Sequence, residues 1–357
     1  MGCCEATNPD LSGVVTPTLT EPSPFDRRTA LKGMAAVAGA LTLSGCGRRP
    51  EGGATALRLA FCGQLLCVIP YEVARARKHF LAQNLDVELV YTRGGNAAMQ
   101  ALVGGAVDYA GTSFDVVLQA AANGASVRRF ASTGRLPLYA LATAPGRSGA
   151  IVSVNDLKGT TVAISGLGNA DHALLLFLLD QAGIAASEVR LATIGTNVFD
   201  ALRIGQVDAA MVQEPALTLI VAAGGRELVN FMDIDEARRH LGGPYEFMGV
   251  AVRTDERDRR LPEMRRLAAA LEAGLTDTRT IPPGEIIAAL PGALLAGSDV
   301  AQLTQIIQRY RLSLYPERVT LEIEAARRVA RAQEIAGILE AGRIDLTALL
   351  DTAALGG

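Results

Sequence analysis

From residue 57 onward, short apolar runs alternate with longer amphipathic stretches, the pattern of α/β proteins. The apolar runs are too short for helices, and turn residues bound them, so we expect strands. The expected strands span 57–61, 87–91, 107–111, 127–131, 161–164, 189–194 and 207–212. The helices between them begin at turns of small polar residues, such as Gly94–Asn96, Ser113 and Ser165–Asn169. The pattern therefore predicts an α/β fold.

The last third of the chain has a different pattern. We expect a strand at 247–252 that returns to the first domain. After it, amphipathic spacing in 261–275 and 321–339 predicts helices.

One sequence pattern, a repeated phrase of ten residues, occurs in both halves of the chain. Residues 101–110 and 201–210 each start with Ala-Leu, pass a Gly and continue with Val-Asp into an apolar run. We interpret the repeat as two related lobes, although a helix–Gly–strand succession is also generic in α/β proteins.

The composition narrows the classes of function that the chain can have. The 357 residues contain 34 Lys+Arg and 37 Asp+Glu, a net charge of −3, which excludes a dedicated nucleic-acid binder. Apolar residues make up 49%, too many for a disordered chain. Aromatic residues make up 4%, and Trp is absent, which disfavours a site that stacks sugars or RNA bases. The apolar stretches are too short to span a bilayer.

The N-terminal segment has the organisation of an export signal. Arg27 and Arg28 precede a mild apolar run, which ends in Leu43-Ser44-Gly45-Cys46. The arginine pair resembles a twin-arginine signal, and the final four residues resemble a lipobox, whose cysteine receives a lipid. We predict a signal peptide over 1–45, lipidation of Cys46 and a tether over 46–55. The exported protein would be held at the outer face of the cytoplasmic membrane by the lipid alone.

Three segments of the chain carry a family resemblance. They are Gly94-Gly95-Asn96 with 101–108, Asp156-Leu157-Lys158-Gly159 with 160–166, and Gly205-Gln206-Val207-Asp208 with Gln213-Glu214-Pro215. The chain resembles solute-binding proteins of ABC importers for nitrate, sulfonates, taurine, bicarbonate or thiamine-pyrimidine precursors.

The resemblance implies a periplasmic-binding-protein type II-like fold, with two lobes that are each a mixed sheet flanked by helices. Lobe 1 would span 56–140 plus 245–357, and lobe 2 would span 141–244. A ligand cleft would lie between them. The implied partners are a small polar or anionic solute and an ABC permease.

Helix starts are the expected ligand contacts. Their free N–H groups and partial positive charge bind anions, and they lie at the carboxyl ends of the strands. The candidate ligand-binding residues are Gln64, Thr112, Ser113, Gly166, Asn169, Asn197 and Glu214. Thr112, Ser113, Asn169 and Asn197 are also ordinary helix-capping residue types. Glu214 suits a ligand amine or ring N–H, or alternatively a helix start.

Cysteines and aromatic residues leave alternatives open. Cys62 and Cys67 either form a disulfide after export or stay free, and without a nearby His they do not make a zinc site. Four aromatic residues either flank a ring-bearing ligand or pack in the core or hinge: Tyr71, Phe114, Tyr245 and Phe247.

Catalytic motifs are missing from the sequence. The three histidines do not form a His-Glu-x-x-His motif, and Gly-x-Ser-x-Gly does not occur. We therefore predict a non-enzyme without metal or cofactor. One alternative is an enzyme like thiamine-pyrimidine synthase, which uses pyridoxal phosphate and needs a lysine; the lysines here are Lys32, Lys78 and Lys158. The other is a ligand-sensing module of the same fold.

Overall fold

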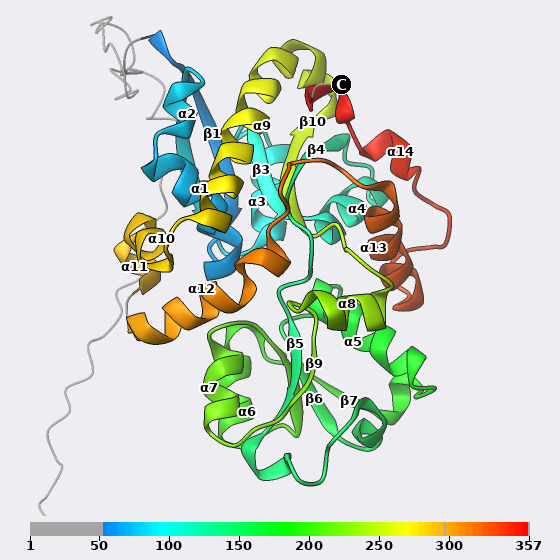
Figure 1. Cartoon of the computed structure of the whole chain (residues 1–357). Helices are drawn as coiled ribbons and strands as arrows, with labels where there is room; N and C mark the ends of the chain where they lie inside the picture. Colours follow the sequence, from blue (N-terminus) through cyan, green and yellow to red (C-terminus); the bar gives the residue numbers. More distant parts are fainter. Residues whose placement is uncertain (1–52, 296, 356–357) are drawn as a thin grey trace, which may run out of the picture. The chain divides into compact units, whose positions relative to one another are not determined.

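The computed structural model describes residues 53–295 and 297–355. The predicted signal peptide with Arg27 and Arg28, the lipidation site Cys46 and most of the tether lie outside the described residues. Figure 1 shows the chain coloured along its sequence, with two separate sheets.

The first sheet contains five strands in the order β2-β1-β3-β10-β4. β1 pairs in parallel with β2 and β3, whereas β10 is antiparallel to both β3 and β4. The prediction that the strand at 247–252 returns to the first domain is thus confirmed. The strands are β1 (Thr55–Cys62), β2 (Leu85–Thr92), β3 (Tyr109–Ser113), β4 (Val127–Gly134) and β10 (Met248–Arg253).

The second sheet repeats this plan in the order β7-β6-β8-β5-β9. β6 is parallel to β7 and β8, and β5 is antiparallel to β8 and β9. Its strands are β5 (Ala140–Thr143), β6 (Thr161–Ile164), β7 (Arg190–Thr193), β8 (Ala209–Val212) and β9 (Glu227–Asn230). The hydrophobic pattern did not predict β5 or β9. Each has only four residues, and every residue of β5 is buried, so neither gives an alternating signal.

The repeated phrase has the same structure in both sheets. The Asp108 carboxylate accepts a hydrogen bond from the Arg58 N–H at 2.7 Å, and Asp208 accepts one from the Thr161 N–H at 2.8 Å. Each aspartate N–H donates back to the carbonyl of the same partner. Each aspartate therefore fixes the third parallel strand of its sheet beside the first.

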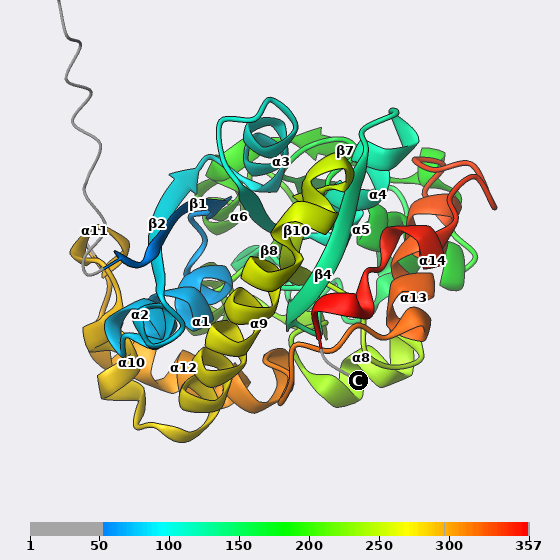
Figure 2. The same ribbon diagram turned by 90° about the horizontal axis from the view of Figure 1, so that it is seen from above.

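Helices flank both sheets (Figures 1 and 2). The helices from the strand–helix units of the first sheet are α1 (Leu65–Ala76), α2 (His79–Ala82), α3 (Gly95–Val103) and α4 (Phe114–Ala122). Those of the second sheet are α5 (Ala170–Gln181), α6 (Val198–Arg203), α7 (Ala216–Ala222) and α8 (Ile234–Leu241).

The remaining helices follow β10 in the sequence. They are α9 (Arg257–Thr280), α10 (Pro283–Ala289), α11 (Gly292–Leu295), α12 (Val300–Leu314), α13 (Ile323–Ile335) and α14 (Leu346–Leu349). α9 packs against α1 and α2, and α13 packs against both α4 and α5. α13 thus contacts a helix from each sheet. None of the helices in the described part of the chain is long and apolar enough to cross a membrane.

Candidate functional site

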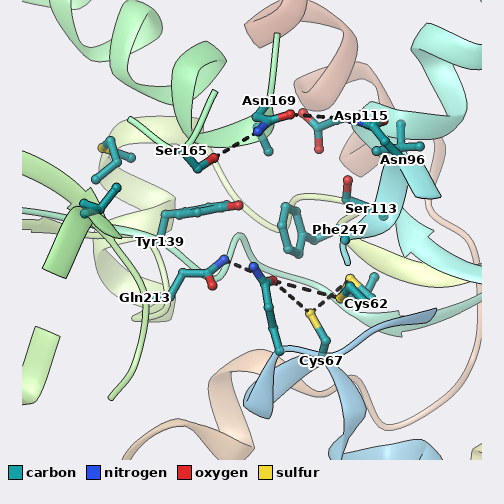
Figure 3. Close-up of a pocket in the computed structure, with 18 of the residues that line it drawn as sticks. Cys62, Cys67, Asn96, Ser113, Asp115, Tyr139, Ser165, Asn169, Gln213 and Phe247 are labelled. Atoms are coloured by element: carbon teal, nitrogen blue, oxygen red, sulfur yellow. Dashed lines mark hydrogen bonds between the residues drawn. The ribbon is translucent and has the colours of Figure 1, made fainter. Parts of the chain in front are cut away.

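A cleft of about 530 Å³ lies where the carboxyl ends of the parallel strands of both sheets face each other. The first sheet contributes residues that follow β1 and end β3, including Gln64 and Ser113. The second sheet contributes residues that follow β6 and β8, including Ser165 and Gln213 (Figure 3). Ligands of open α/β sheets bind at this end of the strands.

The cleft is surrounded by helix N-termini. α1, α3, α4 and α5 have their N-caps in its lining, and within the described chain none of these N-cap residues makes a side-chain capping bond. An aspartate side chain caps α8, α12 and α14, whereas α6, α7, α9, α10 and α13, in the same described part of the chain, also lack a side-chain capping bond. The uncapped ends in the cleft lining direct N–H groups and partial positive charge toward the cleft. This arrangement suits an anion or a hydrogen-bond acceptor.

Asp115 places a buried carboxylate at the cleft, in the first turn of α4. Its Oδ1 accepts hydrogen bonds from Gln333 Nε2 at 2.8 Å and from the Tyr245 hydroxyl at 3.2 Å. Its Oδ2 is buried and has no hydrogen-bond partner among the residues that the structure describes. Burial raises the pKa of Asp115 to about 6, against the opposing effects of these hydrogen bonds and of the Arg129 charge.

An amide chain links Asp115 to the second sheet. Gln333, which donates to Asp115, accepts a hydrogen bond from Gln119 Nε2 at 2.9 Å. The same Nε2 donates to the Gly168 carbonyl at 2.7 Å. Gly168 lies just before α5, so the buried acid is connected to a turn on the opposite side of the cleft.

Two more side-chain pairs join the two sides of the cleft. Gln213 Nε2 donates to Gln64 Oε1 at 3.1 Å, and Asn96 Nδ2 lies 3.5 Å from Asn169 Oδ1 (Figure 3). Both pairs connect a residue next to the first sheet with one next to the second. The described conformation therefore has direct contacts across the cleft.

The cleft lining contains few charges and two aromatic rings. Arg93, which is exposed, is the one basic residue in the lining that the structure describes, beside the acids Asp115 and Glu214. The rings of Tyr139 and Phe247 are perpendicular, with centroids 6.2 Å apart. In the described ranges, 53–295 and 297–355, no group of three or more His, Cys, Asp and Glu gathers as a metal site.

The family of the protein follows from the part of the sequence that contains most of the cleft lining. Residues 67–282, well over half of the chain, match the family model described as NMT1/THI5 like. The chain belongs to the NMT1/THI5-like family. A search of curated protein sequences gave no match.

Solved structures share the fold of this NMT1/THI5-like protein. The alkanesulfonate-binding protein SsuA from Xanthomonas axonopodis pv. citri, bound to MOPS, is 20% identical, with a TM-score of 0.65 over 84% of this chain and 98% of that one. The periplasmic nitrate-binding protein NrtA from Synechocystis PCC 6803 is 11% identical, with a TM-score of 0.65 over 85% and 87%. A protein from Bordetella bronchiseptica RB50 is 22% identical, with a TM-score of 0.73 over 85% and 96%. The predicted α/β periplasmic-binding-protein fold is confirmed.

Four of the candidate contact residues line the cleft of this family member: Gln64, Ser113, Asn169 and Glu214. The Asn169 side chain does not cap α5; its Nδ2 donates to Ser165 Oγ at 3.0 Å. Glu214 has both carboxylate oxygens engaged by Thr218, through the Thr218 N–H at 3.1 Å and its hydroxyl at 3.0 Å. These hydrogen bonds fit the helix-start role of Glu214, and its place in the cleft lining keeps it a candidate ligand contact.

Thr112, Gly166 and Asn197 lie outside the cleft lining. Successive side chains of a strand face opposite sides, and Thr112 is fully buried, whereas the next residue reaches the cleft. A Cβ added at Gly166 would lie 2.8 Å from Asn169 Nδ2, so this glycine leaves room for that amide. Asn197 precedes α6 without a side-chain capping bond, and Val198 beside it lines the cleft.

Several lining residues were not predicted as contacts, among them Asn96, Asp115, Gln119, Tyr139, Ser165 and Gln213. Asp115 carried the signal of an ordinary first-turn acid, two positions after a predicted helix start. Of the four aromatic candidates, Phe247 lines the cleft. Tyr71, Phe114 and Tyr245 are fully buried, consistent with the core-packing alternative.

Proposed function

We propose that the protein is a non-catalytic solute-binding component of an ABC importer, which holds one small polar or anionic solute in this cleft. The observation that carries the proposal is the set of uncapped helix N-termini around the cleft. Such ends bind an acceptor group without a cluster of basic side chains. The fold shared with proteins named for binding alkanesulfonate and nitrate supports the same function.

The solute is amphoteric in this proposal. Its acceptor end, a sulfonate or a ring acceptor, lies at the helix N-termini. Its donor end, an ammonium group or a ring N–H, faces the unpartnered Oδ2 of Asp115. A taurine-like aminosulfonate and an aminopyrimidine both have the two ends. Nitrate has no donor, and the ionised Asp115 would repel it.

Binding would close the two lobes, 56–140 plus 245–357 and 141–244, around the solute. The contacts across the cleft, such as Gln213 to Gln64, exist only when the lobes are close together. A solute that touches helix starts of both lobes binds the closed state better and shifts the population toward it. The closed form would then dock on the permease.

Export and anchoring complete the proposal. The signal peptide over 1–45, with Arg27 and Arg28, would direct the protein out of the cytoplasm. The lipid on Cys46 and the tether over 46–55 would hold it at the outer face of the cytoplasmic membrane. This location places the cleft on the side from which an importer takes up its solute.

The pyridoxal-phosphate enzyme finds no support in the cleft. A Schiff base with the cofactor needs a lysine amine. Of the lysines in the described residues, Lys78 and Lys158 do not line the cleft, and the Lys158 ammonium pairs with Glu188 at its exposed position. Lys32, in the predicted signal peptide, lies outside the described residues.

The test is a thermal-shift screen of the protein lacking residues 1–46, since residues 50–357 form one compact unit. The panel contains nitrate, ethanesulfonate, 2-aminoethanesulfonate, and an aminopyrimidine with its desamino analogue. We expect the amine-bearing member of one pair to raise the Tm more than its partner without the amine. At a hundred times its Kd, a ligand adds about 2.7 kcal/mol to the free energy of unfolding.

Two results would contradict the proposal. The absence of a shift with every compound would count against solute binding by this cleft. Equal shifts with and without the amine would count against the donor end at Asp115.

A further inference from the structure

Three sulfur atoms meet in the wall of the cleft that belongs to the first sheet. Cys62 ends β1, Cys67 lies in the first turn of α1, and Met248 begins β10. Cys67 Sγ lies 3.6 Å from Met248 Sδ, and Gln64 Oε1 lies 3.6 Å from Cys67 Sγ and 4.0 Å from Cys62 Sγ (Figure 3). The three sulfur-bearing residues line the cleft, yet each is at most 5% exposed. The site is therefore reachable from the cleft and shielded from bulk water.

The spacing of Cys67 Sγ and Met248 Sδ suits a shared ion. Two sulfurs that bind one metal at about 2.3 Å, with a tetrahedral to trigonal angle, lie about 3.8–4.0 Å apart. The distance of 3.6 Å between Cys67 Sγ and Met248 Sδ is close to this range, so a small rotamer adjustment would admit an ion. Both cysteines are free in the structure.

The donor set selects a soft ion. Thiolates and thioethers favour monovalent copper over hard cations such as Mg²⁺ or Ca²⁺. Structural zinc prefers four ligands from Cys, His and carboxylates, whereas this site has two cysteines and one methionine. Trigonal coordination by three sulfurs matches the number of donors present.

The thiols must lose their protons to bind a metal. Both thiols are almost fully buried, with 5% exposure for Cys62 and 2% for Cys67. The ion supplies the positive charge that the buried Cys67 thiolate lacks. The N-terminus of α1 also favours negative charge at its first turn.

We propose that Cys62, Cys67 and Met248 form a binding site for a soft monovalent metal ion of the copper(I) class in the wall of the cleft. Two Sγ–H bonds break, both protons pass to solvent, and three sulfur–metal bonds form. An ion added in the monovalent state is neither oxidised nor reduced. The site lies beside the proposed solute position and does not depend on which solute binds there.

The test uses the full chain with Cys3, Cys4 and Cys46 replaced by serine, so that Cys62 and Cys67 are the remaining thiols. Reduced protein is titrated with Ag(I), a redox-inert substitute for copper(I), against a chromophoric competitor. We expect one equivalent to bind, with release of protons and a higher Tm.

Variants identify the ligands. Changes in the outer shell of a metal site alter affinity by about 10- to 100-fold, so Cys62→Ser and Cys67→Ser should each exceed this loss. Met248→Leu should weaken binding less, because a thioether is the weaker donor. Met211→Leu is the matched control: it changes a methionine that also lines the cleft, and it should leave the affinity unchanged.

Two outcomes would overturn the proposal. One is Ag(I) affinity that survives in the Cys62→Ser/Cys67→Ser double variant. The other is exported protein, isolated without reductant, whose mass is lower by two hydrogens and whose thiol count is zero, since a Cys62–Cys67 disulfide leaves no thiolate ligands. Circular dichroism of the metal-free variants shows whether each is folded.

Discussion

Replacing Asp115 with asparagine tests whether this carboxylate is the buried charge of the cleft. The substitution keeps the shape of the side chain and an Oδ1 that can accept from Gln333 and Tyr245. It removes the negative charge. Any difference between the wild type and Asp115→Asn that changes with pH therefore reports ionisation of Asp115.

The magnitude follows from the raised pKa of Asp115. The folded value is about 6 and the ordinary value is 3.8, so the folded state holds the proton more tightly than the unfolded state. The stabilisation that comes from the tightly held Asp115 proton is fully present below pH 3.8 and is lost as the pH rises through 6. The difference of about 2 pH units corresponds to about 3 kcal/mol in the free energy of unfolding. Asp115→Asn should lack this loss.

The assay is urea denaturation of both proteins from pH 4 to pH 8. The free energy of unfolding of the wild type, relative to that of Asp115→Asn, should fall by up to about 3 kcal/mol over this range. Burial also raises the pKa of Glu246 to about 7, so Glu246→Gln is measured in parallel to remove its contribution. Arg129 acts on both carboxylates and is kept in every variant. Parallel curves for the wild type and Asp115→Asn would refute the reasoning.

Three further predictions concern packing, closure and anchoring. Gly249→Ala should lower the free energy of unfolding by about 3 kcal/mol, because its Cβ would collide with the Arg129 guanidinium and with the backbone carbonyl oxygen of Ala131. Gly146→Ala, with open space around it, should change the free energy of unfolding little in the same urea assay. Gln213→Ala removes a hydrogen bond across the cleft and should weaken solute binding by about 1 kcal/mol in calorimetry, with unchanged affinity as the contrary result. Cys46→Ala should release the protein from the membrane fraction; retention there would refute lipidation.

The fold was largely predictable because its parallel strands are separated by turns with distinctive residues. The helix expected from Gly94–Asn96 toward Val103 is α3 (Gly95–Val103), and the helix expected near Ala170 is α5. α8 was missed although Asp233 caps it and Gly242 follows it with a positive φ. That helix is short, and polar side chains cover most of its surface.

The site was less predictable than the fold, for two physical reasons. A candidate such as Ser113 can be recognised from its neighbours in the sequence, because a small polar residue after a strand marks a helix start. The environment of Asp115 cannot be recognised in this way, because its hydrogen-bond partner Gln333 lies 218 positions away in the chain. The second difficulty was the direction of side chains. The helix start before α4 was predicted at the right place, but side chains alternate along a strand, so Thr112 points away from the cleft and Ser113 points toward it.

The repeat of the fold also explains how the cleft acquires two walls of helix starts. In the first sheet α1, α3 and α4 follow β1, β2 and β3, and in the second α5, α6 and α7 follow β6, β7 and β8. The two sets of helix starts therefore occupy equivalent positions and face the cleft from both sides. Both walls contain hydroxyls, amides and a carboxylate, Asp115 in the first and Glu214 in the second, but among the lining residues only the first wall contains thiols, those of Cys62 and Cys67. In the proposed function, a solute that pairs with both walls would do so only when the lobes are closed, so recognition and closure would depend on the same contacts.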